Sequence, residues 1–333
     1  MARRVTILDV AQAAGVSVAT VSKVINGRYG VAGSTSARVL AVAQEMGYES
    51  SLVARSMRSQ RTDVIGILVG EFEPFSAEIL KGATAAVRST RYELLAYTGA
   101  HHSGNTGWER RNLSRLSGTL IDAAVLVTPR DVDLDAGIPL VTIDPHTGPV
   151  QVPSVASDNA IGAAMATRHL LELGHRRIAF LSGRQDLRSS GQRYDGYVRA
   201  LAQAGIDPDP DLVRPASYDR ESVPTAALDL LSLPRRPTAV LAANDLSALV
   251  TVDLARALGL RVPDDLSVVG FDDVPEAAQA RPPLTTVRQP LQQMGQAAVE
   301  LLIQLLEGAE PERTQIVLPT SLVRRATTAP PPV

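Results

Sequence analysis

Residues 15–27 read GVSVATVSKVING. Ser17 carries a hydroxyl suited to the N-cap of a helix. Three of the residues after it recur at the i, i+3 and i+4 spacing of one buried helix face: Val21, Val24 and Ile25. Val18 and Ala19 lie off that face although both are apolar. The pattern predicts a short helix that packs on one side and presents an apolar pair outward.

The segment before it, TILDVAQAAG (residues 6–15), predicts another helix. Thr6 can cap that helix with Asp9 three residues later, and Gly15 ends it. Its apolar residues have the same spacing: Ile7, Val10, Ala11 and Ala14. A third helix is predicted from about residue 34 to residue 46. Two helices joined by a tight glycine-containing turn and braced by a third form a helix-turn-helix unit.

A helix-turn-helix unit places the start of its second helix in the DNA major groove. A thymine methyl group there can pack against an apolar side chain, so Val18 and Ala19 are candidate base readers. Lys23, one turn later, can reach a guanine edge or a phosphate. The other candidates for DNA contact carry hydrogen-bonding groups: Thr6, Ser17, Thr20, Ser22 and Asn26. An exposed Val and Ala alone would carry little meaning, because such residues are common on protein surfaces.

The charge distribution favours the DNA interpretation. Residues 1–62 hold eight Lys and Arg against three Asp and Glu, a formal charge of +5, and the remaining chain carries −7. A basic head on an acidic body predicts that only the head meets a polyanion. The 333 residues, 45% of them hydrophobic, suffice for two or three domains. The absence of cysteine excludes a disulfide framework and thiolate metal sites.

The N-terminal segment MARRVTILDVAQAAG does not have the pattern of a signal peptide. Asp9 and Gln12 interrupt any apolar core that such a peptide needs. We therefore expect no signal peptide, no membrane span and a cytoplasmic location.

From residue 63 the pattern changes to short apolar runs alternating with longer amphipathic stretches such as residues 76–89 and 245–259. Seven runs have the length of a buried strand: residues 63–70, 92–98, 123–128, 139–143, 176–183, 238–243 and 266–273. Apolar strands separated by helices predict parallel sheets covered on both faces. So many strand–helix units predict two α/β subdomains.

Polar side chains follow several of these strands, where parallel sheets bind their ligands. The candidates are Asp144, Asn244, Asp245, Asp272 and Asp273, together with Arg193 at the start of a helical stretch. Carboxylates, amides and a guanidinium suit a hydroxyl-rich ligand, because each can hold two adjacent hydroxyls in a fork. A helix N-cap is the better interpretation of Asp245. For Arg193 and Asp272 a site role is favoured.

Enzyme motifs are missing from the sequence. It contains no phosphate-binding G-x-x-x-x-G-K-[ST] loop, and no G-x-G-x-x-G follows the first strand. The five histidines have no metal-binding spacing: His101, His102, His146, His169 and His175. We expect no enzymatic activity, no cofactor and no metal.

The stretch DVAQAAGVSVATVSKVING (residues 9–27), with VARSMRS (residues 53–59), resembles the DNA-binding head of the lactose/galactose-repressor (LacI/GalR) family of bacterial transcription regulators. The resemblance continues along nearly the whole chain. It implies a small all-α helix-turn-helix head and an α/β body of two parallel-sheet subdomains like that of periplasmic binding proteins. It also implies a repressor that binds an inverted-repeat operator as a homodimer.

The resemblance divides the chain into a head, a hinge and a body with two subdomains. The implied ranges are 1–49 for the head, 50–62 for the hinge and 63–330 for the body, with an N-subdomain of about 63–156 and 290–317 and a C-subdomain of about 157–289 and 318–330. In the family the hinge orders on operator DNA and inserts an apolar side chain between base pairs from the minor groove. Met57 stands at that position, beside Arg55 as a further DNA contact.

The resemblance also implies a small sugar-like effector held between the subdomains. The positions that match the family's effector site are Phe75, Asp144, Arg193, Tyr218, Asn244, Asp272 and Gln289. Glu73, two residues before Phe75, replaces an asparagine usual in relatives, so we expect a ligand preference different from theirs. Two other classes remain as alternatives: an extracytoplasmic sugar-binding protein and a sugar-acting α/β enzyme.

Overall fold

The computed structural model describes residues 5–25, 30–48, 61–99, 107–130, 137–145, 152–184, 186–218 and 221–332. The chain divides into two compact units. One is Met1–Thr62 with Gly118–Leu120, which we call the head, and the other is Asp63–Ser117 with Ile121–Val333, which we call the body.

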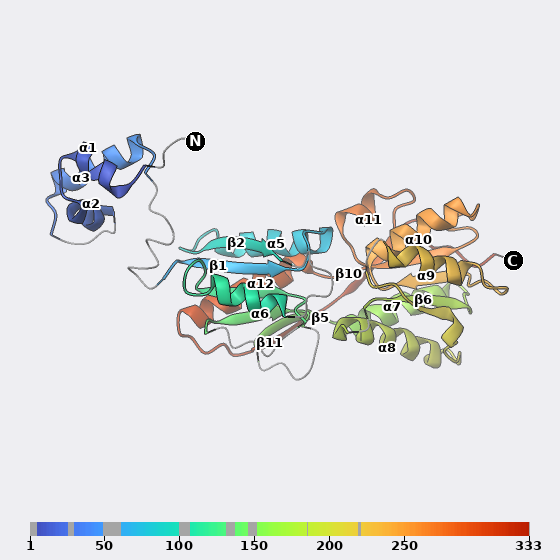
Figure 1. Ribbon diagram of the computed structural model, residues 1–333. Helices are drawn as coiled ribbons and strands as arrows, with labels where there is room; N and C mark the ends of the chain where they lie inside the picture. Colours follow the sequence, from blue (N-terminus) through green and yellow to red (C-terminus); the bar gives the residue numbers. More distant parts are fainter. Residues whose placement is uncertain are drawn as a thin grey trace. The chain divides into compact units, whose positions relative to one another are not determined.

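The described part of the head holds three short helices (Figure 1): α1 (Ile7–Ala14), α2 (Val18–Ile25) and α3 (Gly33–Glu45). Thr6 caps α1 by a reciprocal pair of bonds, in which the Thr6 amide donates to Asp9 Oδ2 at 2.8 Å and the Asp9 amide donates to Thr6 Oγ1 at 3.4 Å. Gly15 ends α1 with a φ of 63°, a left-handed conformation that favours glycine. Helices α1 and α2 meet at 104°, as in a helix-turn-helix.

The three helices share a small apolar core centred on Val10, Val21 and Val39, which are fully buried. Its other buried members are Ala11, Ala14, Val24 and Ala43. The prediction of a helix-turn-helix head is therefore confirmed. No single helix in the described part of the chain has the length and apolarity needed to cross a membrane, while the bent pair α1 and α2 meets that criterion jointly by length and composition.

The body contains two six-stranded sheets. The first runs in the order β11-β5-β4-β3-β1-β2 with all neighbours parallel. Its strands are β1 (Val64–Val69), β2 (Glu93–Thr98), β3 (Ala123–Val127), β4 (Leu140–Ile143), β5 (Ser154–Ser157) and β11 (Gln315–Leu318). One face packs on α5 (Pro74–Val87) and α12 (Leu291–Leu306), around buried Ile67, Ile79 and Met294. The sheet is also accompanied by α6 (Trp108–Leu116).

The second sheet runs in the order β12-β10-β9-β8-β6-β7, parallel except for β12 against β10. Its strands are β6 (Ile178–Ser182), β7 (Val213–Pro215), β8 (Ala239–Ala242), β9 (Ser267–Asp272), β10 (Thr285–Arg288) and β12 (Ser321–Val323). Helices cover both faces, as Figure 1 shows on either side of β6. They are α7 (Asn159–Glu172) and α8 (Arg188–Gln203) on one face, with α9 (Ser222–Leu231) and α10 (Asp245–Ala257) on the other. Two short helices, η1 (Pro210–Leu212) and α11 (Pro275–Gln279), complete the sheet's connections.

The predicted fold class is confirmed, and each of the seven predicted apolar runs is a strand. The remaining strands escaped the sequence pattern because they are short and lie mostly toward sheet edges. Edge strands such as β11, with its exposed Val317, need no continuous apolar run.

Candidate functional site

The outer surface of α2 carries the predicted base-reading residues. Val18 is 36% exposed, and Ala19 and Lys23 are also exposed. The Thr20 amide donates to Ser17 Oγ at 3.1 Å, and the two hydroxyls lie 2.9 Å apart, so Ser17 and Thr20 together cap the helix. The first turn of α2 thus presents an apolar pair on an ordered cap, with Lys23 one turn later.

The remaining predicted DNA contacts have different surroundings. Thr6 uses its hydroxyl and amide in the cap of α1, and Ser22 is partly buried on α2. Asn26, Arg55 and Met57 lie outside the described residues, as does most of the predicted hinge, and they stay predictions.

In the body, polar residues from both sheets meet in one place, which we call the buried polar cluster. Its members are Asp144 after β4, Ser157 at the end of β5, Asn159 at the start of α7, Arg193 on α8, Asp272 at the end of β9, and Gln289 after β10. Every member is at most 6% exposed. Because four of its members lie at the ends of strands or directly after them, the cluster is at the carboxyl ends of the strands, where ligands bind in open α/β sheets.

Arg193 is the only cation in the cluster. Its Nε donates to Asn159 Oδ1 at 2.7 Å and its Nη1 donates to the carbonyl of Ala243. Nη1 also lies 3.7 Å from Asp272 Oδ1, and the guanidinium carbon lies 3.8 Å from the centroid of the Phe271 ring. Such a held guanidinium can present its remaining N–H donors in a fixed direction.

A hydrogen-bonded chain links the carboxylates of the cluster. Gln289 Nε2 donates to Asp272 Oδ1 at 2.6 Å, and the hydroxyl of Ser157 donates to Gln289 Oε1. Asp144 accepts from the amide of Ser157 and from the side chain of Asn159. Asp144 and Ser157 lie at the carboxyl ends of strands of the first sheet, and Asp272 and Gln289 lie at those of the second, so the hydrogen-bonded chain joins the two sheets.

Burial controls the charge of the two carboxylates. Desolvation raises the pKa of Asp144 to about 6, against the opposing effect of Arg193. Desolvation likewise raises the pKa of Asp272 to about 7; Arg193 and Gln289 oppose this rise, and repulsion from Glu73 and Asp144 adds to it. Both groups therefore titrate near neutral pH. When ionised, the two carboxylates can accept hydrogen bonds from the hydroxyl groups of a ligand, and Arg193 can donate hydrogen bonds to the oxygen atoms of those hydroxyls.

We expect these raised pKa values to appear in the pH dependence of stability. Between its unfolded value of 3.8 and its folded value of about 7, Asp272 binds more protons when folded. Its contribution to the free energy of unfolding therefore falls as pH rises through that window, by about 2 kcal/mol between pH 5 and pH 8. Urea unfolding of the parent and of Asp272→Asn at both pH values measures this effect. The free energy of unfolding of the variant, relative to that of the parent, should be higher at pH 8 than at pH 5.

His169 and His175 serve as an internal check, because burial lowers their pKa from 6.5. Their contributions are complete above pH 6.5 and are lost as pH falls, in the opposite direction to Asp272. Since both proteins contain them, they cancel in the difference between parent and variant. An equal difference at the two pH values would contradict the assignment for Asp272.

The N-cap interpretation of Asp245 was wrong. Asn244 is the N-cap of α10, accepting from the Ser247 amide at 2.9 Å. Asp245 is fully buried and accepts from Thr286 Oγ1 at 2.5 Å and from the Val274 amide at 2.9 Å. Because the Thr286 hydroxyl and the Val274 amide both donate to it, a carboxylate is satisfied at position 245, inside α10, rather than at the N-cap. Asn244 is half-buried, and its amide nitrogen is not needed for the cap.

Asp273, beside Asp272, is fully engaged by two guanidinium groups. It lies 2.6 Å from the nearest nitrogen of both Arg288 and Arg325. These ion pairs hold the loop after β9 and leave Asp272 as the carboxylate that faces Arg193.

Two aromatic residues complete the predicted effector positions. Tyr218 is partly buried after β7, and its hydroxyl interacts electrostatically with Arg193, Asp272 and Asp144, which places it at the cluster. Phe75 is half-buried at the start of α5 and packs against the core of the first sheet. Glu73 lies near enough to raise the pKa of Asp272.

Ser157 and Asn159 were missed from the sequence. Both belong to the run SVASDNA, in which the strand is only four residues long. The pair Asp158-Asn159 is a sequence signal for a helix that starts directly after a strand. In the structure Asp158 is the N-cap of α7 and accepts from the Ile161 amide at 3.0 Å.

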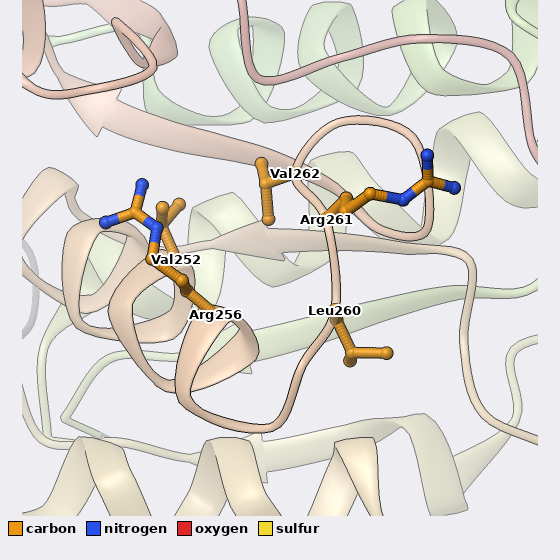
Figure 2. Close-up of a pocket in the computed structure, with 5 residues that line it drawn as sticks. All are labelled: Val252, Arg256, Leu260, Arg261 and Val262. Carbon is orange, nitrogen blue, oxygen red and sulfur yellow. The ribbon is translucent and has the colours of Figure 1, made fainter.

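A separate surface pocket lies on the second sheet's side of the body (Figure 2), lined by Val252, Arg256, Leu260, Arg261 and Val262. Arg261 pairs with Asp264 and Asp265, and Arg256 lies 3.7 Å from Asp253. Its charged groups thus have intramolecular partners, and none of its residues belongs to the buried polar cluster. In the described part of the chain, no group of three or more His, Asp or Glu is arranged to hold a metal ion.

Two protein-family models match the chain, one in the head and one in the body. Residues 6–51 match the family model described as bacterial regulatory proteins, lacI family, and residues 167–328 match that of a periplasmic binding protein-like domain. The HTH-type transcriptional repressor PurR of Photobacterium profundum is 34% identical, over 96% of this chain and 97% of the relative.

Two solved structures resemble the chain over nearly its whole length. The complex of the transcriptional regulator CelR with cellobiose is 35% identical with a TM-score of 0.74, covering 97% of this chain and all of that one. The lac repressor dimer bound to operator and the anti-inducer ONPF is 27% identical with a TM-score of 0.81, covering 98% and 100%.

Proposed function

We infer the function of this protein from the premise that the chain belongs to the lacI family of bacterial regulatory proteins. It is a DNA-binding transcriptional regulator of two parts, a helix-turn-helix head and an effector-binding α/β body. We propose that it represses transcription and that a small, hydroxyl-rich molecule controls its affinity for the operator. Because its target is chromosomal DNA, we place it in the cytoplasm.

The observation that carries this proposal is the buried polar cluster. Its hydrogen-bonded chain connects residues that follow strands of both sheets, so a ligand that contacts Arg193, Asp144 and Asp272 changes the interactions that join the sheets. A ligand shifts a two-state equilibrium only by its difference in affinity for the two states. The cluster supplies such a difference, and we propose that the body binds its effector without converting it.

We propose that the operator is an inverted repeat read by two heads of a homodimer. A single head contacts too few base pairs for useful specificity. A dimer with two-fold symmetry requires an operator with the same symmetry, which is an inverted repeat. The lac repressor structure that this chain resembles is a dimer on operator DNA, which supports the same arrangement here.

The test is an electrophoretic mobility shift on the DNA upstream of the chain's own gene, with a scrambled duplex as control. Specific binding is expected, and one sugar among a panel of glucose, ribose and cellobiose should change it. Equal affinity for both duplexes would contradict the regulator assignment. Specific binding that no hydroxyl-rich compound alters would contradict the effector class alone.

We expect Val18→Ser to reduce operator affinity about fivefold to tenfold for each head, because losing an apolar contact with a thymine methyl costs about 1 kcal/mol. Non-specific affinity should stay constant, since phosphate contacts supply it. Fluorescence anisotropy on operator and scrambled DNA at one salt concentration measures both.

Leu40→Ser on α3 is the matched control for Val18→Ser, because Leu40 is also exposed, at 53%, but lies outside α2. It should leave operator affinity unchanged. If both variants bind the operator as the parent does, Val18 does not read a base.

A further inference from the structure

Gly183 directly follows β6, and the ring of Tyr218 occupies the space that a side chain there would need. A Cβ atom at Gly183 would lie 1.8 Å from Cζ, 2.1 Å from the hydroxyl oxygen and 2.4 Å from Cε1 of Tyr218. Carbon atoms in contact are normally about 3.5–4.0 Å apart. Only glycine therefore fits position 183 while Tyr218 keeps its place.

The backbone also directs Tyr218 toward Gly183. The Ala216 amide donates to the Ser182 carbonyl at 2.9 Å, which ties the end of β7 to the end of β6. Ser217 and Tyr218 then have φ angles of 43° and 64°, two consecutive non-glycine residues in the left-handed region. Such conformations persist only where the surrounding structure holds them.

The hydroxyl of Tyr218 reaches the buried polar cluster. It is buried and has no partner of hydrogen-bond geometry in the described part of the chain. Ser190 lies close enough to affect its ionisation, and so do Arg193 and Asp272. Buried beside Ser190, Arg193 and Asp272, the phenol can donate a hydrogen bond to a ligand oxygen.

We propose that Gly183 is a positioning residue for effector recognition, because its missing side chain lets Tyr218 place its ring and hydroxyl against the buried polar cluster. The inference rests on the proposed function. With a methyl group at position 183 the tyrosine ring must swing away, and the cluster loses both an aromatic surface and a hydrogen-bond donor for a hydroxyl-rich ligand. All three of the nearest atoms belong to the far end of the Tyr218 side chain, so the conflict is relieved locally.

The variants that test this are Gly183→Ala, Tyr218→Ala and the double variant, with Gly191→Ala as matched control. A Cβ at Gly191, on the exposed side of α8, would meet nothing within 4 Å. Nitration by tetranitromethane, followed by peptide mass spectrometry, reports the exposure of Tyr218 without any ligand. We expect the parent and Gly191→Ala to react slowly at Tyr218, and Gly183→Ala to react at least about ten times faster.

Thermal unfolding separates positioning from general damage. Gly183→Ala should lower Tm by about 2–4 °C in the parent and have no effect in the Tyr218→Ala background, where the conflicting atoms are absent. Equal Tm changes in both backgrounds, or parental nitration of Tyr218 in Gly183→Ala, would overturn the proposal.

Operator release by glucose, ribose or cellobiose connects positioning to function. Gly183→Ala and Tyr218→Ala should lose the response that the parent shows, with release measured relative to the operator affinity of each variant without sugar. A parental response in Gly183→Ala would overturn the role in recognition. If the parent itself does not bind the operator specifically, the proposed function fails, and the nitration and unfolding results still decide the placement of Tyr218.

Discussion

Replacing Arg193 with alanine is expected to abolish the effector response while leaving operator binding in place. Arg193 is the cation that faces Asp272, and it also donates to Asn159. Each charge-assisted hydrogen bond contributes about 1.5–3 kcal/mol, so effector affinity should fall at least about 100-fold. Without the guanidinium the two carboxylates stay protonated at neutral pH and accept ligand hydroxyls poorly.

The measurement is effector-induced release in a mobility shift, with thermal unfolding beside it. Removing one partner from a buried ion pair costs about 3–5 kcal/mol, so Arg193→Ala should also unfold at a lower temperature. Arg193→Lys keeps the charge and loses the planar fork, and it should lose the response with a smaller loss of stability.

Arg199→Ala is the matched control on the same helix, because Arg199 is exposed. It should behave as the parent. A folded Arg193 variant that releases operator at the parent's effector concentration would show that the effector binds elsewhere.

The reciprocal expectation concerns the head, where Val21→Asp should abolish operator binding and spare the effector site. Val21 is fully buried at the centre of a core of seven small residues. An unpaired buried carboxylate costs several kcal/mol, and a domain of this size has about that much stability in total. The head should unfold, and operator affinity should fall at least about 1000-fold.

Leu40→Ala is the control for this experiment, because Leu40 lies on α3 of the same unit with its side chain exposed. Surface changes of this kind alter stability by less than about 0.5 kcal/mol, so the head stays folded. Amide NMR signals of the head and calorimetric effector binding report the two units separately. Loss of effector binding in Val21→Asp would contradict the separation of head and body.

The two expectations concern different compact units, the head and the body. Arg193→Ala should leave operator binding in place, and Val21→Asp should leave effector binding in place. A protein that only bound a sugar would show no operator binding in any variant. An enzyme acting on a sugar would show turnover that depends on Arg193 with no change in DNA affinity. The pair of variants therefore discriminates among all three classes.

The sequence by itself determined the helices of the head and the central strands of both sheets. These features are local: the buried stripe of α2 follows from the 3.6-residue period, and a strand covered on both faces requires a continuous apolar run. Residues 15–27 and the run at 266–273 show the two cases. The outward position of Val18 and Ala19 follows from the same period.

Only the tertiary structure decided which side chains of the buried polar cluster contact one another. Ser157 and Gln289 bond although 132 positions separate them, and the order of strands that brings them together is not written in either segment. The same holds for the exchange of roles between Asn244 and Asp245, and for the contact of Gly183 with Tyr218. Periodicity fixes which face a side chain occupies, whereas its partners depend on strand order and on close packing between distant segments.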